Sequence, residues 1–351
     1  MVFRRARRSA TLLLASALLA ATAVLPPVGS AETTVVIPGA SLFKSLNPRY
    51  PAIAATYPQI GRHFHGDEHP LVVDYSQDPF TFDRSLRDGV ERAREMVRDL
   101  EGDVVIVGES MGSMVATRLA EEFAADAPTS RNLRLVLIAP PEPGAARLFK
   151  EGAFVPLLNY RVRRMPELPY PTTVVVGEYD PWADPPDRPW NLVAMANAVL
   201  GFFYVHGPPS WQIDPADIPP ENVTVSGNVT RYFVPTPQLP LTRPLRDLGV
   251  PDGVVDVADS ILRPVIDAGY RRHDEPGDTR PYLSEGRLLR GDGEEPDLGP
   301  QRRRSESGSH ADRSPRAERT ERTERAEDRD VRRSASSSRD QARTARHARV
   351  S

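Results

Sequence analysis

Residues 103–120, with the sequence DVVIVGESMGSMVATRLA, constrain the fold of this chain more than any other stretch. The β-branched run at residues 104–107 predicts a buried strand, and apolar residues at helical spacing after Gly112 predict a helix. Between them lies Gly-Glu-Ser-Met-Gly, a G-x-S-x-G sequence. In this context the pattern is typical of a nucleophile elbow, where small glycines allow a sharp turn that lifts the serine hydroxyl above the sheet edge. Ser110 is therefore the candidate nucleophile, and an ordinary Gly/Ser-rich turn is the alternative.

The same turn predicts where a developing oxyanion would be bound. The N-terminus of the following helix directs backbone N–H groups at a negative charge, and the N–H of Met111 is the nearest of them. A second donor is expected from the loop after an early strand at residues 33–38, which continues into Gly-Ala-Ser. The backbone N–H of Ala40 or Ser41 is the candidate, with a simple turn as the alternative.

A later strand, at residues 172–176, supplies the candidate acid. Asp180 follows its carboxyl end, where the active groups of open α/β sheets gather, and Asp184 is the alternative. An aspartate after the serine fits the chain order Ser, Asp, His and would hold an imidazole in one tautomer. His206 leaves an apolar run onto a Gly-Pro-Pro loop and is the expected base. His273, among charged residues, is the alternative.

The remaining pattern predicts an α/β architecture. An amphipathic helix at residues 85–100 and a strand at 133–139 that is expected to be fully buried extend the order to β, β, α, β, α, β. This order indicates an α/β-hydrolase fold with a mainly parallel central sheet and helices on both faces. Residues 223–235 alternate in a way that predicts a final hairpin or edge strand. Residues 140–171 are interpreted as a cap with an apolar lining, or alternatively as a surface excursion.

Composition divides the chain into three segments. Residues 1–31 combine arginine pairs, an apolar stretch and small residues, which is typical of a secretory signal peptide, with a retained membrane anchor as the alternative. Residues 32–275 are expected to form the α/β-hydrolase domain. Residues 276–351 are rich in Arg, Glu, Asp and Ser and are expected to be disordered, because they bury too little apolar area to offset their ordering entropy. These segments predict a secreted or cell-envelope protein whose tail could contact an envelope surface.

Charge and residue types limit the partners and cofactors. The net charge of −3 provides no overall field that attracts nucleic acid. The chain has no cysteine, which excludes disulfides, a thiolate nucleophile and zinc–cysteine sites. The spacing of His63, His65 and His69 suggests a metal site, but no further ligands follow at a familiar spacing. We therefore expect no cofactor, no metal and no nucleic-acid partner.

Three stretches resemble the PE-PPE domain hydrolases, secreted serine hydrolases of mycobacteria and related actinobacteria that have an α/β-hydrolase fold and are akin to cutinases. The resemblance extends over residues 35–270. It is carried by GESMGS at 108–113, GEYDPWADPPDRPWNLVAMANAVLGFFYVHG at 177–207 and LPLTRPLRDLG at 239–249. The middle stretch is the most diagnostic.

Carried over to this sequence, the resemblance implies Ser110 as nucleophile, Asp180 as acid partner and His206 as base. The chain departs from the family pattern in three places. A predicted signal peptide stands in place of the N-terminal PE or PPE helical module, Pro181 stands where glycine is usual, and two prolines follow His206.

The resemblance implies ester substrates, either short-to-medium acyl esters or lipid acyl groups moved between envelope glycolipids such as acylated trehalose. The residues themselves predict acyl transfer through a serine ester. A hydrolase and an acyltransferase would share this triad and differ in whether the pocket admits water or a bound acceptor. A non-catalytic envelope-binding protein on the same fold is the third possibility.

Overall fold

The computed structural model describes residues 32–125 and 132–291. The predicted signal peptide at residues 1–31 lies outside the described residues. So does the greater part of the predicted disordered tail, residues 292–351.

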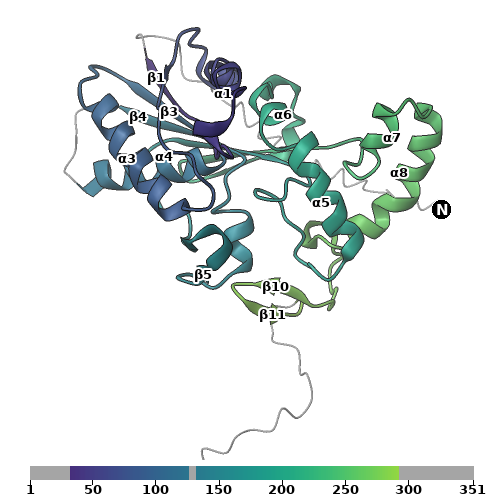
Figure 1. The fold of residues 1–351 in the computed structure, drawn as a ribbon. Coiled ribbons are helices and arrows are strands. Elements are labelled where there is room, and N and C mark those ends of the chain that lie inside the picture. Colours follow the sequence, from purple (N-terminus) through teal and green to yellow (C-terminus); the bar gives the residue numbers. More distant parts are fainter. Residues whose placement is uncertain (1–31, 126–131, 292–351) are drawn as a thin grey trace, which may run out of the picture. The chain divides into compact units, whose positions relative to one another are not determined.

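A seven-stranded sheet forms the centre of the described fold (Figure 1), with the strand order β2-β1-β3-β4-β7-β9-β8. All neighbouring strands are parallel except β8 and β9, which form an antiparallel hairpin at one edge. The mainly parallel sheet and the hairpin predicted at residues 223–235 are therefore confirmed, although a second short hairpin follows it in the chain. The strands of this sheet are β1 (Thr33–Ile37), β2 (Leu71–Val72), β3 (Val104–Glu109), β4 (Leu133–Ile138), β7 (Thr172–Gly177), β8 (Val223–Ser226) and β9 (Val229–Val234).

The two faces of β3 pack against different segments. A Cβ on Gly108 would point at the first turn of α4 (Met111–Ala125), beside which α3 (Phe82–Arg98) packs. Side chains alternate between the faces of a strand. Val107 therefore points the other way, and its side chain lies 2.9 Å from where a Cβ on Gly61 would be. Glu109, the last residue of β3, is two positions after Val107, so its side chain also lies on this second face.

Short helices cover that second face. They are η2 (Tyr57–Gln59), α2 (Arg62–His65) and α6 (Pro208–Trp211). The Gly61 N–H donates to the Trp211 carbonyl oxygen at 3.2 Å. The Phe64 ring packs edge-on against Tyr232 of β9, with 5.5 Å between the ring centroids. Helices on both faces of the sheet, as predicted, are therefore present.

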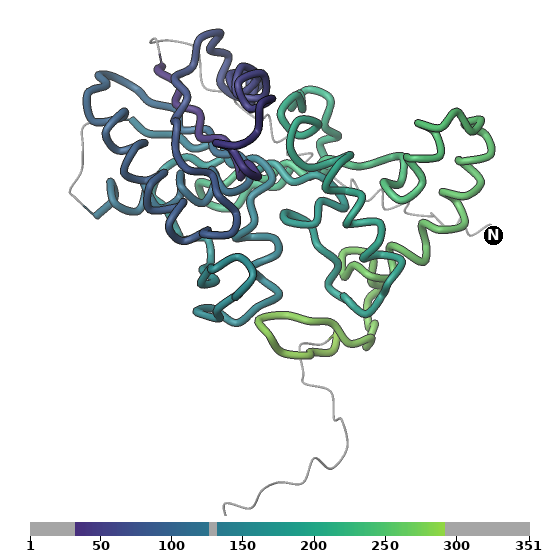
Figure 2. Tube along the Cα trace, in the orientation of Figure 1, coloured from purple at the N-terminus to yellow at the C-terminus, as the bar shows by residue number. Residues whose placement is uncertain are grey.

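The remaining elements lie outside the seven-stranded sheet. α5 (Leu192–Tyr204) and α8 (Asp252–Asp267) pack against each other to one side of the sheet (Figures 1 and 2). The rings of Tyr179 and Tyr270, with centroids 5.4 Å apart, are buried in one cluster with residues of both helices. The other elements are η1 (Lys44–Leu46), α1 (Tyr50–Ala54), η3 (Ala145–Leu148), β5 (Phe154–Val155), η4 (Pro156–Leu158), β6 (Tyr160–Arg161), η5 (Pro215–Asp217), η6 (Pro220–Asn222), α7 (Arg243–Asp247), η7 (Arg271–His273), β10 (Tyr282–Ser284) and β11 (Arg287–Leu289).

The predicted end of the folded domain at residue 275 is wrong. β10 and β11 form an antiparallel hairpin within the range predicted to be disordered. Tyr282 is buried against the Arg271 guanidinium, which lies 3.7 Å from the ring centroid, and the Leu283 N–H donates to the Asp187 carbonyl oxygen at 2.8 Å. The prediction failed because it averaged this short apolar hairpin with the strongly charged sequence that follows it.

Candidate active site

Ser110 lies in a tight turn between β3 and α4. Its φ of 52° is in the left-handed region, which is uncommon for a residue with a side chain, and its N–H donates to the Ile138 carbonyl oxygen at 2.9 Å. A Cβ on Gly112 would lie 2.0 Å from the carbonyl oxygen of Ile37, and one on Gly108 would lie 2.5 Å from that of Gly112. Both positions therefore require glycine. This is the geometry of a nucleophile elbow.

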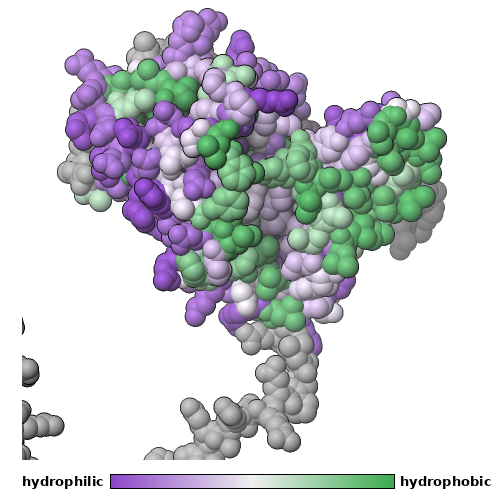
Figure 3. Space-filling view, viewed as in Figure 1, coloured by the Kyte–Doolittle hydropathy of each residue, from purple (hydrophilic) through white to green (hydrophobic). Residues whose placement is uncertain are grey.

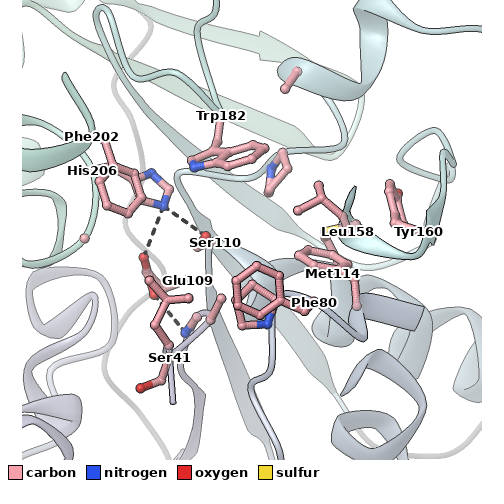
Figure 4. Close-up of a pocket in the computed structure, with 18 of the residues that line it drawn as sticks. Ser41, Phe80, Glu109, Ser110, Met114, Leu158, Tyr160, Trp182, Phe202 and His206 are labelled. Atoms are coloured by element: carbon pink, nitrogen blue, oxygen red, sulfur yellow. Dashed lines mark hydrogen bonds and ion pairs between the residues drawn. The ribbon is translucent and has the colours of Figure 1, made fainter. Parts of the chain in front are cut away.

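The Ser110 hydroxyl is the first member of a hydrogen-bonded relay. Its Oγ lies 2.9 Å from His206 Nε2, and His206 Nδ1 lies 2.8 Å from Asp180 Oδ2. Figure 4 shows His206 directed at Ser110 from the end of α5. Asp180 is fully buried, and its Oδ1 accepts from the N–H groups of Trp182 and Ala183 at 2.8 and 3.1 Å. The structure thus brings together the three residues for which the sequence predicts catalytic roles.

The two alternative residues bind other partners. Asp184 forms an ion pair with Arg272 at 2.8 Å, and His273 lies 3.5 Å from a carboxylate oxygen of Asp267. Asp180 is therefore the aspartate that contacts His206.

Opposing effects act on the pKa of His206. Burial of the imidazole by itself lowers this pKa, but the negative charge and hydrogen bond of Asp180, together with the charge of Glu109, outweigh burial and raise it above the ordinary value. The ring also stacks on Phe202, with 5.7 Å between the centroids. The imidazole of His206 is therefore oriented by the Asp180 carboxylate at Nδ1 and by the Phe202 ring against one of its faces.

The raised pKa predicts how activity depends on pH. A general base works in its neutral form, and a raised pKa keeps His206 protonated up to a higher pH. We expect kcat/KM to fall as pH decreases, with a midpoint above the ordinary histidine value of 6.5. A pH profile of ester turnover, with circular dichroism at each pH to verify folding, measures this midpoint. A midpoint below 6.5 would contradict the assignment.

The candidate oxyanion donors differ in their availability. The Ser41 N–H donates to the Gln77 carbonyl oxygen at 2.8 Å and is not free to bind an oxyanion, so the prediction of Ser41 as a donor is wrong. The Ala40 N–H has no hydrogen-bond acceptor within residues 32–125 and 132–291. The Met111 N–H is the first of α4 and therefore lacks an acceptor within the helix. Ala40 and Met111 remain the two candidate donors.

An apolar cavity of about 830 Å³ adjoins the relay. Ser110 and His206 lie on its wall, and residues 141–162, part of the predicted cap, supply much of the remaining lining. Figure 4 shows Phe80, Met114, Leu158 and Tyr160 on the side of the serine away from His206, with Tyr160 farthest from it. The cavity can accept an apolar chain with its reacting end at Ser110.

Exposed apolar side chains surround the mouth of this cavity. Leu157, Phe203, Leu42 and Phe80 line the cavity and are also exposed to solvent. Figure 3 shows that the apolar surface continues over α5 and α8, and exposed residues there include Leu192, Val199, Val257 and Ile261. Contiguous apolar surface on a protein commonly marks a site of interaction.

Neither a metal cluster nor a membrane span is found in the described part of the chain. Within residues 32–125 and 132–291, no three His, Cys, Asp or Glu side chains could together hold a metal ion. Of the three clustered histidines, His65 accepts from the Asp67 N–H at 3.0 Å, which is a local turn contact. None of the helices in these two ranges combines the length and apolar character needed to cross a bilayer.

Two further buried residues near the relay, Glu109 and Gln77, were not predicted from the sequence. Glu109 lies within the Gly-Glu-Ser-Met-Gly motif but was given no role. Because side chains alternate along a strand, its position two residues after Val107 places its side chain on the same face as that of Val107. Gln77 is a loop residue with a φ of 56°, and the sequence around it contains no recognisable motif.

Comparison with known proteins gives a family match and several relatives from Mycobacterium tuberculosis. Residues 48–271 match the PE-PPE domain. The chain is 42% identical to an uncharacterised PPE family protein, PPE63, over 191 residues, which cover 53% of this chain and 40% of the relative. It therefore spans about two fifths of that relative's length.

Two further relatives are covered over most of their length. The chain is 32% identical to the SL1278 acyltransferase Chp1, covering 74% of this chain and 69% of the relative. It is 33% identical to the diacyltrehalose acyltransferase Chp2, covering 71% of this chain and 77% of the relative. With the strand order and the turn at Ser110, these matches show that the chain belongs to the PE-PPE domain family and has an α/β-hydrolase fold.

Proposed function

We propose that this protein is a serine enzyme that acts on carboxylic esters, with Ser110 as nucleophile, His206 as general base and Asp180 as the residue that orients the imidazole. The observation that carries the proposal is the relay of 2.9 and 2.8 Å contacts from Ser110 through His206 to Asp180, at the wall of an apolar cavity. Nucleophile, base and orienting group within hydrogen-bond reach are the signature of covalent acyl transfer.

The reaction would proceed in two halves. His206 Nε2 takes the proton of Ser110 Oγ as that oxygen attacks the ester carbonyl, and Asp180 stabilises the imidazolium that forms. The N–H groups of Ala40 and Met111 bind the oxyanion. His206 then protonates the departing alcohol, leaving an acyl-serine. In the second half His206 deprotonates an acceptor hydroxyl, which attacks the acyl-serine and releases Ser110.

The acceptor decides between two activities. Water gives an esterase, and a sugar hydroxyl gives an acyltransferase that moves acyl groups between envelope glycolipids such as acylated trehalose. The relatives Chp1 and Chp2, named as acyltransferases, and the esterase PE16 of Mycobacterium tuberculosis support an ester substrate of either kind. The apolar cavity and its apolar mouth favour lipid esters over soluble polar ones.

We further propose that the protein works outside the cytoplasm, as a secreted or envelope protein. The support is the sequence of residues 1–31, which has the charge, apolar stretch and small residues of a signal peptide. Contact of the arginine-rich segment after residue 291 with an anionic envelope surface belongs to the same proposal.

A fluorophosphonate probe tests the enzymatic proposal. The purified protein is expected to become covalently labelled, and Ser110→Ala is expected to abolish labelling. Ser113→Ala is the matched control, because the Ser113 hydroxyl donates to the Ser110 carbonyl oxygen rather than facing His206. An inert but folded wild type would instead indicate a non-catalytic envelope-binding protein.

Product analysis separates the two activities. A lipid ester incubated with the enzyme, with and without a trehalose acceptor, is resolved by thin-layer chromatography. Free fatty acid in both samples identifies an esterase. A new acylated sugar formed only with the acceptor identifies an acyltransferase.

A further inference from the structure

Glu109, the residue before the candidate nucleophile, carries a buried carboxyl group on the wall of the cavity. Its side chain lies on the face of β3 opposite α4, and it is only 4% exposed. Figure 4 shows this carboxyl group below His206, on the same side of the ring as Ser110. Its Oε1 lies 3.8 Å from His206 Nε2, the nitrogen that also contacts Ser110 Oγ. His206 thus has a carboxyl group near each ring nitrogen, Asp180 at Nδ1 and Glu109 at Nε2.

The other oxygen of Glu109 holds the loop that carries the candidate oxyanion donor. Oε2 accepts from the Gly39 N–H at 2.8 Å. A Cβ on Gly39 would lie 2.3 Å from this oxygen and 2.9 Å from the Ser110 Cβ, so the loop approaches both residues closely. Only glycine permits this approach without displacing the carboxyl group. The position of the next residue, Ala40, therefore depends on the bond between Gly39 and Glu109.

Gln77 fixes the same loop from its opposite side. Its amide Nε2 donates to the Gly39 carbonyl oxygen at 2.7 Å, and its backbone oxygen accepts from the Ser41 N–H. Tyr50 in turn donates to the Gln77 side chain at 2.7 Å. The groups flanking Ala40 are thus held by three hydrogen bonds, while its own N–H stays without an acceptor in the described chain.

We propose that Glu109 is a positioning residue that joins the oxyanion loop, residues 39–41, to the catalytic imidazole. Its Oε2 fixes Gly39 so that the Ala40 N–H stays beside Ser110, and its Oε1 places a second negative charge beside His206 Nε2. The inference rests on the proposed function, because both actions serve the Ser110–His206 pair.

Two other titratable side chains face the Glu109 carboxyl group besides His206 and Asp180, namely Tyr57 and Tyr75. Burial raises the pKa of Tyr57 to about 12 and that of Tyr75 well above its ordinary value, so both phenols remain neutral at neutral pH. Burial raises the pKa of Glu109, and the charge of His206 and the Gly39 N–H oppose this rise by stabilising the carboxylate. The carboxylate would stabilise the imidazolium that forms when Ser110 loses its proton.

Two substitutions separate the charge of Glu109 from its hydrogen bond. Glu109→Gln keeps the size and an acceptor oxygen for Gly39 but removes the charge. We expect the acid midpoint of kcat/KM to move to lower pH by about 1 unit, because an anion near His206 raises its pKa. Glu109→Ala also releases the loop, and we expect kcat to fall a further ~10²-fold, as when an oxyanion donor is lost. KM should change little in either variant.

Glu142→Gln is the matched control, because Glu142 is also a buried glutamate but pairs with Arg118 rather than His206. Its pH midpoint should equal that of the wild type. Kinetics are normalised to active sites counted with the fluorophosphonate probe, so a poorly folded fraction does not count as lost activity. An unchanged midpoint in Glu109→Gln, or a wild-type kcat in Glu109→Ala, would overturn the inference. A wild type that neither labels nor turns over esters would instead overturn the proposed function.

Discussion

Replacing Ser110 by alanine is expected to lower ester turnover by about 10⁴- to 10⁶-fold, and replacing His206 by alanine should lower it by a similar factor. The two residues act in one proton transfer, so removing either one eliminates the step. The double variant is therefore expected to be no slower than the slower single variant. Independent contributions would multiply the two losses instead.

The measurement is kcat for a chromogenic ester with each single variant and the double variant, under conditions where all three are folded. Thermal unfolding monitored by circular dichroism provides the folding control. Retention of more than about a tenth of wild-type kcat in Ser110→Ala would remove Ser110 as nucleophile. Multiplicative losses in the double variant would contradict the 2.9 Å relay.

Asp180→Asn is expected to lower kcat by about 10⁴-fold, whereas Asp184→Asn should alter kcat by less than about threefold. An asparagine at position 180 can donate to His206 Nδ1 and so favours the wrong tautomer of the imidazole. Asp184 faces Arg272 instead, and burial raises its pKa to about 6 even though the Arg272 charge opposes this rise. Its substitution should therefore lower the melting temperature more than the turnover.

The pair of variants is compared in kcat and in melting temperature, which separates the two carboxylates. The expected pattern is a slow but stable Asp180→Asn and an active but less stable Asp184→Asn. The reverse pattern would mean that Asp184 reaches His206 in the working enzyme and that the 2.8 Å contact of Asp180 is not the functional one.

The sheet and the elbow could be predicted because their signals are local. Residues 104–107 before Ser110 are all apolar, and a glycine stands two positions away on either side of the serine. His206 could be predicted because few histidines follow Asp180 in the sequence. In each case a short sequence pattern or a small number of candidate residues was sufficient for the prediction.

Contacts between distant segments could not be predicted. Both Asp180 and Asp184 follow β7, and only the position of Arg272 in the fold separates their roles. Ser41 was excluded as a donor by the backbone oxygen of Gln77, a residue with no recognisable pattern around it. Burial of the β10–β11 hairpin likewise depends on partners far away in the sequence.

That hairpin determines where the protein can be shortened. Arg188 is almost completely buried and donates to the carbonyl oxygen of Pro281 at 3.0 Å as well as to Asp274. A protein ending at residue 275 would retain Ser110, His206 and Asp180. It would, however, expose the Arg188 guanidinium and remove the Leu283 N–H that donates to the Asp187 carbonyl oxygen. Arg188 and Asp187 both belong to the loop between β7 and α5 that also carries Asp180. A hairpin that does not itself line the cavity thus supports the loop that carries Asp180, and a truncation after residue 291 would keep this support.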